Sequence, residues 1–238
     1  MRGKLTNGNW RTPFNPLSSA HRKDDYVEGN AWQYTWLVPQ DPYGLIDLFG
    51  SEEKFIAKLD SLFSLTDKVE GEDVSPDISG LIGQYAHGNE PNHHIPYLYA
   101  YVGQPWKTAK LIREIDDKFY STKPDGLCGN EDLGQMSAWY ILSSMGFYSV
   151  NPANGVYVLG SPLVNTVVIH HTKDVSFTIN AIDNSASNIY IQKAEYNSKP
   201  YTKSYITQDM IVKGGELKLY MGNKPSTTWG VKKEDRPQ

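Results

Sequence analysis

The sequence predicts a mainly α fold with a C-terminal antiparallel β region, and two observations support this. Before about residue 150 the apolar side chains recur at helical spacing, whereas short β-branched runs between turn signals occupy the rest. Helices followed by a run of strands are typical of a helical layer with a small antiparallel sheet. We therefore expect a helical region at 1–154 and a small antiparallel β region at 155–238. The 238 residues allow one large domain or two small ones.

The first clear helix follows Ser51. This residue can cap the helix, and Glu52 and Glu53 in the first turn complement the helix dipole. The apolar positions that follow keep a spacing near 3.6 residues: Phe55, Ile56, Leu59, Leu62 and Phe63.

Two more helices are expected before residue 150. One opens near Pro105, which suits the first helical position. Its apolar stripe consists of Trp106, Ala109, Ile112, Ile115 and Phe119. The other runs from about Gly134 to Met145, and Gly146 is a plausible stop signal. Segments 29–38 and 92–102 are weaker helix candidates.

Five β-branched runs follow in the C-terminal region, at 156–159, 166–170, 176–179, 189–194 and 216–221. Turn signals such as Asn154-Gly155 and Gly214-Gly215 separate them. These runs are the predicted strands of the β region.

Bulk properties exclude several classes of protein. The net charge is −4 and the charges are spread along the chain, so no basic stripe indicates nucleic acid binding. No apolar stretch approaches the roughly 20 residues of a membrane span. Cys128 is the only cysteine, so an intrachain disulfide is impossible, although this does not decide the compartment. The N-terminal residues have no apolar core of a signal peptide, and none is expected in this chain.

The segment 26–36 surrounds Glu28 with aromatic rings, two amides and a glycine. Rings cover the apolar faces of sugars and amides pair with hydroxyl groups. A Glu walled by rings can have a raised pKa, which suits a proton donor. The alternative is an aromatic helix packed in a core with Glu28 as its capping acid, and rings at helical spacing usually are core residues.

The second motif, 87–94, brings three histidines, two asparagines and Glu90 into eight residues. Carboxylate and amide oxygens suit hard cations such as calcium, whereas imidazoles favour zinc. His93 and His94 are adjacent, so they lack the i, i+4 spacing of a helical zinc pair. An oxygen-rich cation site is therefore the better interpretation. The alternative is a structural loop in which Asn92 caps a helix and Glu90 is solvated.

The third motif, 129–140, places acids and an amide in a loop just before a helix. A carboxylate near the helix N–H groups stays ionised, which suits a general base that activates water. The alternative is strong here, since Glu131 or Asp132 could simply cap the helix. An acid in an aromatic wall and a base at a helix entry are the two groups that glycoside hydrolysis needs.

At these three motifs the chain resembles glycoside hydrolase family 92, the calcium-dependent exo-α-mannosidases. The matching strings are 28–34, 87–94 and 129–140, in the same order and at similar spacing. The resemblance implies a β-sandwich followed by an (α/α)6 toroid, with this chain supplying a portion of the toroid. It also implies hydrolysis of terminal α-mannosyl linkages, α-1,2 above all, with inversion at the anomeric carbon.

The same resemblance implies roles for individual residues. Glu28 would be the general acid and Asp132 the general base. Asn89 and Glu90 would help to hold calcium. The wall of the mannose site would consist of Trp32, Gln84, His87 and His93.

Two departures from the family pattern affect this interpretation. The family often has a second acid two residues before the base, where this chain has Asn130. The family's members are also far longer, so the resemblance covers only their C-terminal portion. Half a toroid would expose apolar helix faces. The expected partners are therefore a mannose-containing glycan and either the missing N-terminal portion or a second copy. A periplasmic or extracellular location is implied.

Two other functions are possible on the sequence. The first is a carbohydrate-binding or inactive fragment that uses the aromatic and metal loops without chemistry. The second is a metal-dependent phosphoesterase that uses the histidines, but the chain lacks a Gly-rich anion-binding loop.

Overall fold

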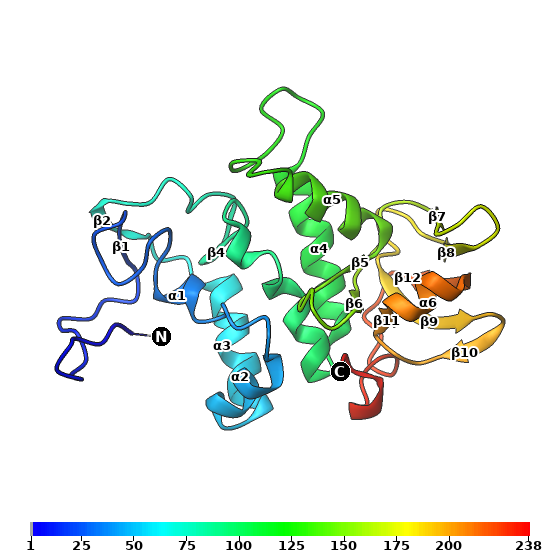
Figure 1. Ribbon diagram of the computed structural model, residues 1–238, viewed down its shortest axis with the longest axis horizontal. Coiled ribbons are helices and arrows are strands. Elements are labelled where there is room, and N and C mark those ends of the chain that lie inside the picture. The colour runs from blue at the N-terminus through cyan, green and yellow to red at the C-terminus, as the bar shows by residue number, and fades with distance from the viewer. Residues whose placement is uncertain (1) are drawn as a thin grey trace. The chain divides into compact units, whose positions relative to one another are not determined.

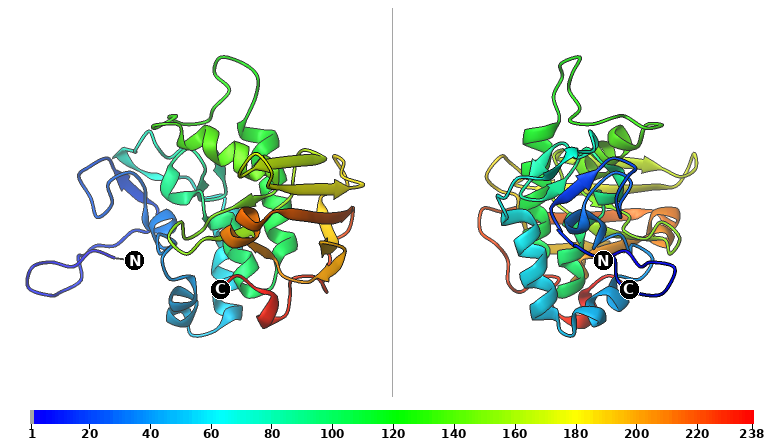
Figure 2. Two further views of the ribbon diagram at one scale, coloured as in Figure 1. Left: turned by 45° about the vertical axis from the view of Figure 1, so that its right-hand side comes forward. Right: turned by 90° about the vertical axis from the view of Figure 1, so that its left-hand side faces the viewer.

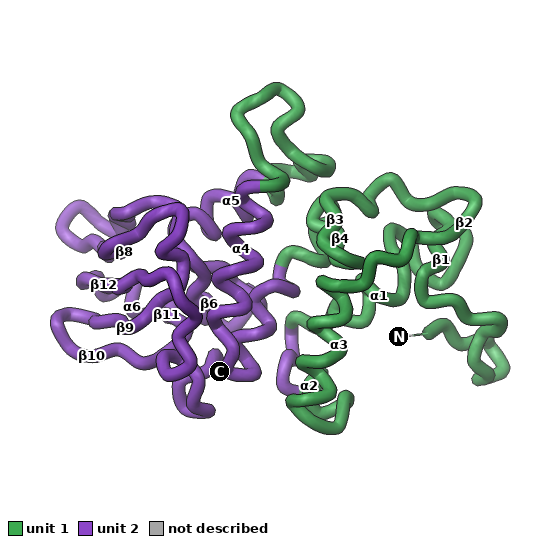
Figure 3. Tube along the Cα trace, turned by 180° about the vertical axis from the view of Figure 1, so that it is seen from behind, with its two compact units in different colours: residues 1–39, 44–93, 118–136 green, residues 40–43, 94–117, 137–238 purple. Residues whose placement is uncertain are grey.

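The computed structural model describes residues 2–238 and divides into two compact units (Figure 3). Unit 1 comprises 1–39, 44–93 and 118–136. Unit 2 comprises 40–43, 94–117 and 137–238. The strands of the C-terminal half thus share a unit with most of the fourth and fifth helices.

Unit 1 is built on short helices joined by ordered loops. The helices are α1 (Ala31–Tyr34), the later residues of α2 (Pro42–Phe49) and α3 (Glu52–Ser64). The predicted cap of α3 is confirmed, because the Ser51 hydroxyl accepts a hydrogen bond from the Lys54 N–H at 3.3 Å. Trp36, Phe49 and Phe55 pack ring against ring beneath α3 with centroids 5.4–5.6 Å apart.

The remaining elements of unit 1 are short and frame its loops. They are the parallel pair β1 (Ser18–Ala20) and β2 (Glu70–Asp73), the hairpin β3 (Leu81–Ile82) and β4 (Tyr85–Ala86), and the 3-10 turn η1 (Glu90–Asn92). Such short pieces hold few ladder hydrogen bonds, so side-chain contacts must position these loops.

Unit 2 contains η2 (Ile95–Val102), most of α4 (Pro105–Phe119) and most of α5 (Gln135–Met145). The predictions of α4 and α5 are confirmed, and Gly146 ends α5 with a φ of 101°. The weaker candidate 92–102 forms the buried 3-10 helix η2, and 29–38 shrinks to α1. The helix α2 was not predicted, because its signal is a Pro42 that also reads as a loop residue.

The five predicted strands are all present, and unit 2 adds further strands around them. The elements are β5 (Phe147–Tyr148), β6 (Val156–Leu159), β7 (Thr166–His170), β8 (Ser176–Ile182), β9 (Tyr190–Tyr196), β10 (Lys199–Tyr201), β11 (Tyr205–Thr207), α6 (Gln208–Lys213), β12 (Gly215–Gly222) and η3 (Lys233–Asp235). The strands among them form a three-stranded sheet, β11-β6-β5, and a five-stranded sheet, β10-β9-β12-β8-β7. Figures 1 and 2 show the five-stranded sheet from several directions.

The larger sheet is mixed, which corrects the prediction of a wholly antiparallel region. Strand β12 pairs antiparallel with β9 but parallel with β8, with Leu217 opposite Ile179. The chain passes through β11 and α6 before β12, and this crossover returns β12 between β9 and β8. Antiparallel pairing was expected from consecutive strands, but β8 and β12 are not consecutive.

The core of unit 2 lies beneath this sheet. Alternate residues of β8 and β12 point inward, so that Phe177, Ile179, Leu217 and Leu219 are all buried. The opposite residues of these strands are partly exposed. This alternation explains why the strands could be found from the period of their apolar residues.

Asp116 on α4 is a buried acid without a compensating partner. Both carboxyl oxygens lack a hydrogen-bond partner. Burial raises its pKa from 3.8 to about 7, against the opposing charge of Arg113. The Arg113 guanidinium donates instead to Ser161, Pro162 and Asn184. Asp116 is therefore an acid whose charged form the fold disfavours.

We expect Asp116→Asn to stabilise the chain at alkaline pH relative to wild type. The folded-state pKa of Asp116 lies above its unfolded value, so its stabilising contribution is full below about pH 4 and is lost as the pH rises through about 7. The wild type should thus lose up to about 4 kcal/mol of unfolding free energy across this window, relative to the variant. Urea unfolding at about pH 5 and about pH 8.5 captures the larger part of this loss, about 3 kcal/mol. Parallel pH profiles would contradict it, and Asp117→Asn at the exposed neighbouring position is the control.

Candidate functional site

The turn after Glu28 is held by a side-chain cap. The Asn30 side chain accepts hydrogen bonds from the backbone N–H groups of Trp32, at 3.0 Å, and Gln33, at 3.3 Å. The Gln33 side chain accepts in return from the Asn30 N–H at 2.9 Å, which completes a capping box. Asn30 and not Glu28 therefore caps α1, so the interpretation of Glu28 as a capping acid is wrong.

Gln84 fastens this turn to the rest of unit 1. Its side-chain oxygen accepts from Asn30 Nδ2 at 3.3 Å, and its carbonyl accepts from Gln33 Nε2 at 3.0 Å. Its own Nε2 donates to the Asp67 carbonyl at 2.6 Å. The buried Gln84 amide is thus engaged by the protein itself, and its predicted contact with substrate stays a prediction.

Trp32 faces a cavity of about 490 Å³ and carries a cation on its ring. Lys58 Nζ lies 3.2 Å from the ring centroid, and burial lowers the pKa of this lysine. The cavity of about 490 Å³ is lined by Arg2, Trp10, Phe14, Pro16, Ala31, Trp32, Thr35, Phe49 and Lys58. One ring face of Trp32 is therefore covered by Lys58, and a sugar would have to use the other face or displace the lysine.

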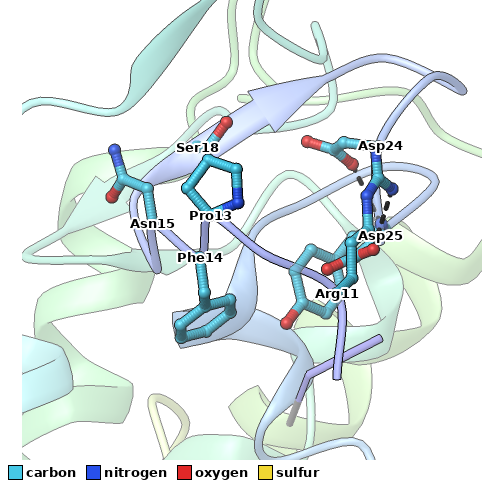
Figure 4. A pocket seen from close by; sticks show the side chains of 8 residues that line it. Arg11, Pro13, Phe14, Asn15, Ser18, Asp24 and Asp25 are labelled. Carbon is cyan, nitrogen blue, oxygen red and sulfur yellow. Dashed lines mark hydrogen bonds and ion pairs between the residues drawn. The ribbon is translucent and has the colours of Figure 1, made fainter. Parts of the chain in front are cut away.

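A smaller hollow of about 220 Å³ lies just before Glu28 in the chain (Figure 4). Arg11 pairs there with Asp25 at 2.8 Å, and Figure 4 shows Asp24 beside them. Burial raises the pKa of Tyr26 to about 12, with further contributions from the charges of Asp25 and Asp24. Burial, assisted by the acids of this hollow, therefore keeps the Tyr26 hydroxyl protonated.

The segment 87–93 meets the backbone of Glu28. The buried side chain of Asn89 donates from Nδ2 to the Glu28 carbonyl at 2.9 Å. Glu28 itself is half-buried, and its N–H donates to the Tyr34 hydroxyl at 3.4 Å. A predicted metal ligand therefore positions the backbone of the predicted acid.

The next residue, Glu90, meets the side chain of Asp132. Burial raises the pKa of Glu90, and the charge of Asp132, a hydrogen bond to it and the charge of Asp77 raise it further. A backbone hydrogen bond of Glu90 opposes this shift. The charges of Asp132 and Asp77 therefore both disfavour the ionised form of Glu90, and a cation beside Glu90 would offset this repulsion.

The two predicted catalytic residues thus contact consecutive residues of one segment, Glu28 through its backbone and Asp132 through its side chain. The backbone of Glu28 is bonded to Asn89, while the side chain of Asp132 interacts with Glu90. The residues 28, 89 and 132 are separated by tens of positions in the chain, yet all lie in unit 1. Folding brings these three sequence motifs together.

Asp132 lies in a strained turn. The φ angles of Asp132, Leu133 and Gly134 are 36°, 59° and 88°, all in the left-handed region. Leu has no local polar group to support this conformation, and its side chain is fully exposed. Strain of this kind persists only where the surroundings hold the turn in place.

His87 and His93 are buried and bonded within the protein. Their rings stack with centroids 4.7 Å apart, and burial followed by the charge of His93 lowers the pKa of His87 well below its ordinary value. Both ring nitrogens of His87 are bonded to tyrosine hydroxyls, those of Tyr85 and Tyr120, each at 2.7 Å. Neither nitrogen of His87 is left for a metal, which argues against the phosphoesterase alternative. The predicted contacts of both histidines with substrate stay predictions.

Oxygen donors around η1 fit a hard cation. Among the buried side-chain atoms, Glu90 Oε1 and Asn92 Oδ1 have no hydrogen-bond partner. Asn92 does not cap a helix, because it lies inside η1 and its Nδ2 donates to the Asn89 carbonyl at 3.3 Å. No group of three or more His, Cys, Asp or Glu side chains within 2–238 is arranged to hold a metal. A cation would therefore need amide, backbone or ligand oxygens besides Glu90.

Several residues of this region were not predicted from the sequence. Asn92 was considered only as a cap, and nothing in the chain marks Tyr85, Tyr120 or Gln135 as neighbours of the histidines. The polar residues of the second motif are irregularly spaced, and this spacing could have marked Asn92 as a functional residue. No comparable signal exists for the tyrosines, since their positions depend on how the loops pack.

Comparisons with known proteins agree with the three motifs. Residues 1–223 match the model of the glycosyl hydrolase family 92 catalytic domain. An uncharacterized secreted glycosidase of Arthroderma benhamiae is 31% identical over 228 residues, which cover 92% of this chain and 26% of that protein. No helix among residues 2–238 is both long and apolar enough to cross a membrane.

Two solved structures extend this likeness. A family GH92 alpha-mannosidase of Bacteroides thetaiotaomicron, in complex with mannoimidazole, is 41% identical with a TM-score of 0.90 and covers 100% of this chain. An inverting GH92 mannosidase of the same organism is 41% identical with a TM-score of 0.86. This chain spans 32% and 33% of their lengths. With its fold, its motifs and most of its length matched, the chain belongs to glycosyl hydrolase family 92.

Proposed function

We propose that this chain supplies the acid, the base and the metal-binding segment of a calcium-dependent α-mannosidase. The observation that carries the proposal is the convergence of Glu28 and Asp132 on the consecutive residues Asn89 and Glu90. The family match and the two mannosidase structures support it. The substrate is a mannose-containing glycan with terminal α-mannosyl residues, and α-1,2 linkages are the expected ones.

The two carboxyl groups divide the reaction between them. Glu28 protonates the glycosidic oxygen as the bond to the leaving group breaks, and Asp132 takes a proton from the attacking water. A single displacement inverts the configuration at the anomeric carbon, and such enzymes keep the two carboxyl groups roughly 6.5–9.5 Å apart. The amide of Asn130 can orient the water but cannot share the negative charge of Asp132.

Calcium fits the oxygen donors of η1, with Glu90 and Asn89 as its proposed ligands and the unpartnered Asn92 oxygen as a third. When bound, the cation supplies positive charge and a fixed point of attachment for sugar hydroxyls. Trp32, Gln84, His87 and His93 form the proposed wall of the mannose site. The hydrogen-bonded histidines give this wall rigidity, because their ring orientation is set by protein partners.

We further propose that a polypeptide segment outside this sequence completes the active site. The chain spans only 26–33% of its relatives, and the fully exposed Leu133 beside Asp132 suits an apolar contact with a completing segment. That segment is the N-terminal portion of a longer enzyme or a second copy. The helical region 1–154 then belongs to an (α/α)6 toroid, followed by the β region 155–238. A periplasmic or extracellular location fits the secreted relative.

The proposal predicts calcium-dependent release of mannose. The complete enzyme, meaning this chain with its completing segment, is incubated with an α-1,2-mannobiose and followed by proton NMR. The first product should be β-mannose, because inversion changes the anomeric configuration. Removing calcium with EDTA should reduce the rate at least tenfold, and added calcium should restore it, whereas magnesium should not because it needs a smaller octahedral site.

Other results would replace the proposal. Initial release of α-mannose would contradict an inverting mechanism. Calcium-dependent mannose binding without any released sugar would favour a carbohydrate-binding or inactive fragment. An EDTA-insensitive rate would remove the cation from the proposal while leaving the two carboxylates in place.

A further inference from the structure

A series of hydrogen bonds, each with a defined donor and acceptor, runs through His87 to the start of α5. The Tyr120 hydroxyl donates to the Met136 carbonyl at 3.2 Å. Because its single proton is used there, it must accept the bond from His87 Nε2, which is therefore protonated. His87 Nδ1 then accepts from the Tyr85 hydroxyl. Every donor in this series of hydrogen bonds has an acceptor, and the tautomer of His87 follows from the bonding pattern.

A second connection runs parallel to the first through His93. His93 Nε2 donates to the His87 carbonyl at 3.0 Å, so its Nδ1 is the unprotonated nitrogen. That nitrogen accepts from the Gln135 side-chain amide at 3.2 Å. Both histidines are buried, with exposed fractions of 0% and 1%, so water competes little for these bonds.

Both connections end directly after the strained turn that carries Asp132. The left-handed residues are 132–134, and the anchored residues are Gln135 and Met136. At its other end, the loop is pressed against the histidine segment, where an added Cβ on Gly129 would lie 2.4 Å from the Gly88 oxygen. A turn with three left-handed residues needs fixed ends if it is to keep one conformation.

We propose that Tyr120 and Gln135 are positioning residues that hold Asp132 beside Glu90. They act through their hydrogen bonds to His87 and His93, which belong to the metal-binding segment. Neither Tyr120 nor Gln135 has to touch the sugar for this role. The catalytic consequence of this proposal rests on the proposed function, because the position of Asp132 affects turnover only if Asp132 is the base. The structural side of the proposal concerns only the order of the 129–136 turn.

The test compares two single-hydroxyl deletions on either side of His87. Tyr120→Phe removes the link from His87 to Met136, whereas Tyr85→Phe removes the bond to the opposite nitrogen of the same ring. Both variants delete one tyrosine hydroxyl that is bonded to His87, so both should lower thermal stability. Only Tyr120→Phe should speed amide hydrogen exchange in 129–136, because only that variant releases the turn.

In the complete enzyme, Tyr120→Phe should lower kcat about 10- to 100-fold while KM changes little, since a misplaced base slows chemistry more than binding. Tyr85→Phe should keep kcat within about threefold of wild type. Gln135→Met, which keeps the side-chain length but removes the amide, should repeat the Tyr120→Phe result. It provides an independent variant should Tyr120→Phe fail to fold.

The positioning role and the proposed function can be contradicted separately. Equal exchange of 129–136 in Tyr120→Phe, Gln135→Met and Tyr85→Phe would overturn the positioning role, whatever the activity. Faster exchange with an unchanged kcat would also overturn it, because the order of the turn would not matter to the reaction. A wild-type enzyme without mannosidase activity would contradict the proposed function, while the exchange comparison would still decide whether the turn is anchored through Tyr120.

Discussion

Glu28→Gln should reduce hydrolysis of an unactivated mannobiose by about 10²–10⁴-fold, the usual contribution of a general acid. A glutamine of the same size cannot protonate the leaving oxygen. An aryl mannoside with a strongly acidic phenol leaves without that proton, so its hydrolysis should fall far less. The ratio of the two losses, measured as kcat/KM on both substrates, identifies the acid. This expectation applies to the complete enzyme with calcium present.

Asp132→Asn is the matched variant for the same experiment. As the proposed base, Asp132 acts on water and not on the leaving group, so its loss should reduce hydrolysis of both substrates by a similar factor, again about 10²–10⁴-fold. Circular dichroism and thermal unfolding check that both variants fold. The assignment of roles would be reversed if Asp132→Asn and not Glu28→Gln spared the aryl mannoside. Near-normal rates in either variant on mannobiose would remove that residue from the mechanism.

Gly129→Ala should strongly damage activity although it changes no charged residue. An alanine Cβ would lie 2.4 Å from the Gly88 oxygen and 2.6 Å from its Cα, which no real structure allows. Both contacts are to backbone, so the two loops must separate instead of a side chain turning aside. Because these loops carry Asp132 and Glu90, we expect a loss of activity of about 100-fold or more. A destabilisation of roughly 1–3 kcal/mol should accompany it.

Gly222→Ala is the control for Gly129→Ala. Its added Cβ would also be crowded, at 2.8 Å from Gln192 Cγ, but that neighbour is an exposed side chain that can move. Steady-state kinetics should therefore stay close to wild type for Gly222→Ala. Equal kinetics for the two variants would show that the close approach of Gly88 and Gly129 has no bearing on the site.

Local sequence signals predicted the elements that have strong local causes. The helix 52–64 has a capping serine, acids in its first turn and an apolar stripe, so its start was predicted to the residue. The strands of the β region were found because their faces alternate between core and surface. The mixed sheet was missed, since the parallel pairing of β8 and β12 depends on a crossover that no local pattern records.

The candidate site divides in the same way. Glu28, Asn89, Glu90 and Asp132 stand in dense polar motifs that suggest a hydrolase with a cation site, and the family resemblance then assigned a role to each residue. The lysine on Trp32 and the bonds that occupy the side chain of Gln84 were not predicted. Long side chains such as Lys58 reach partners that sequence spacing cannot identify.

The amino-acid sequence by itself determined which chemical groups this protein has available: two carboxylates in different surroundings, oxygen donors for a hard cation, and rings for a sugar. The tertiary structure alone decided that Asn89 bonds to the backbone of Glu28 while Glu90 meets Asp132, and that Tyr120 links the buried His87 to Met136 just after the strained turn. The physical reason is that side-chain chemistry belongs to single residues, whereas hydrogen bonds between distant loops exist only after the chain has closed those loops and excluded water from them.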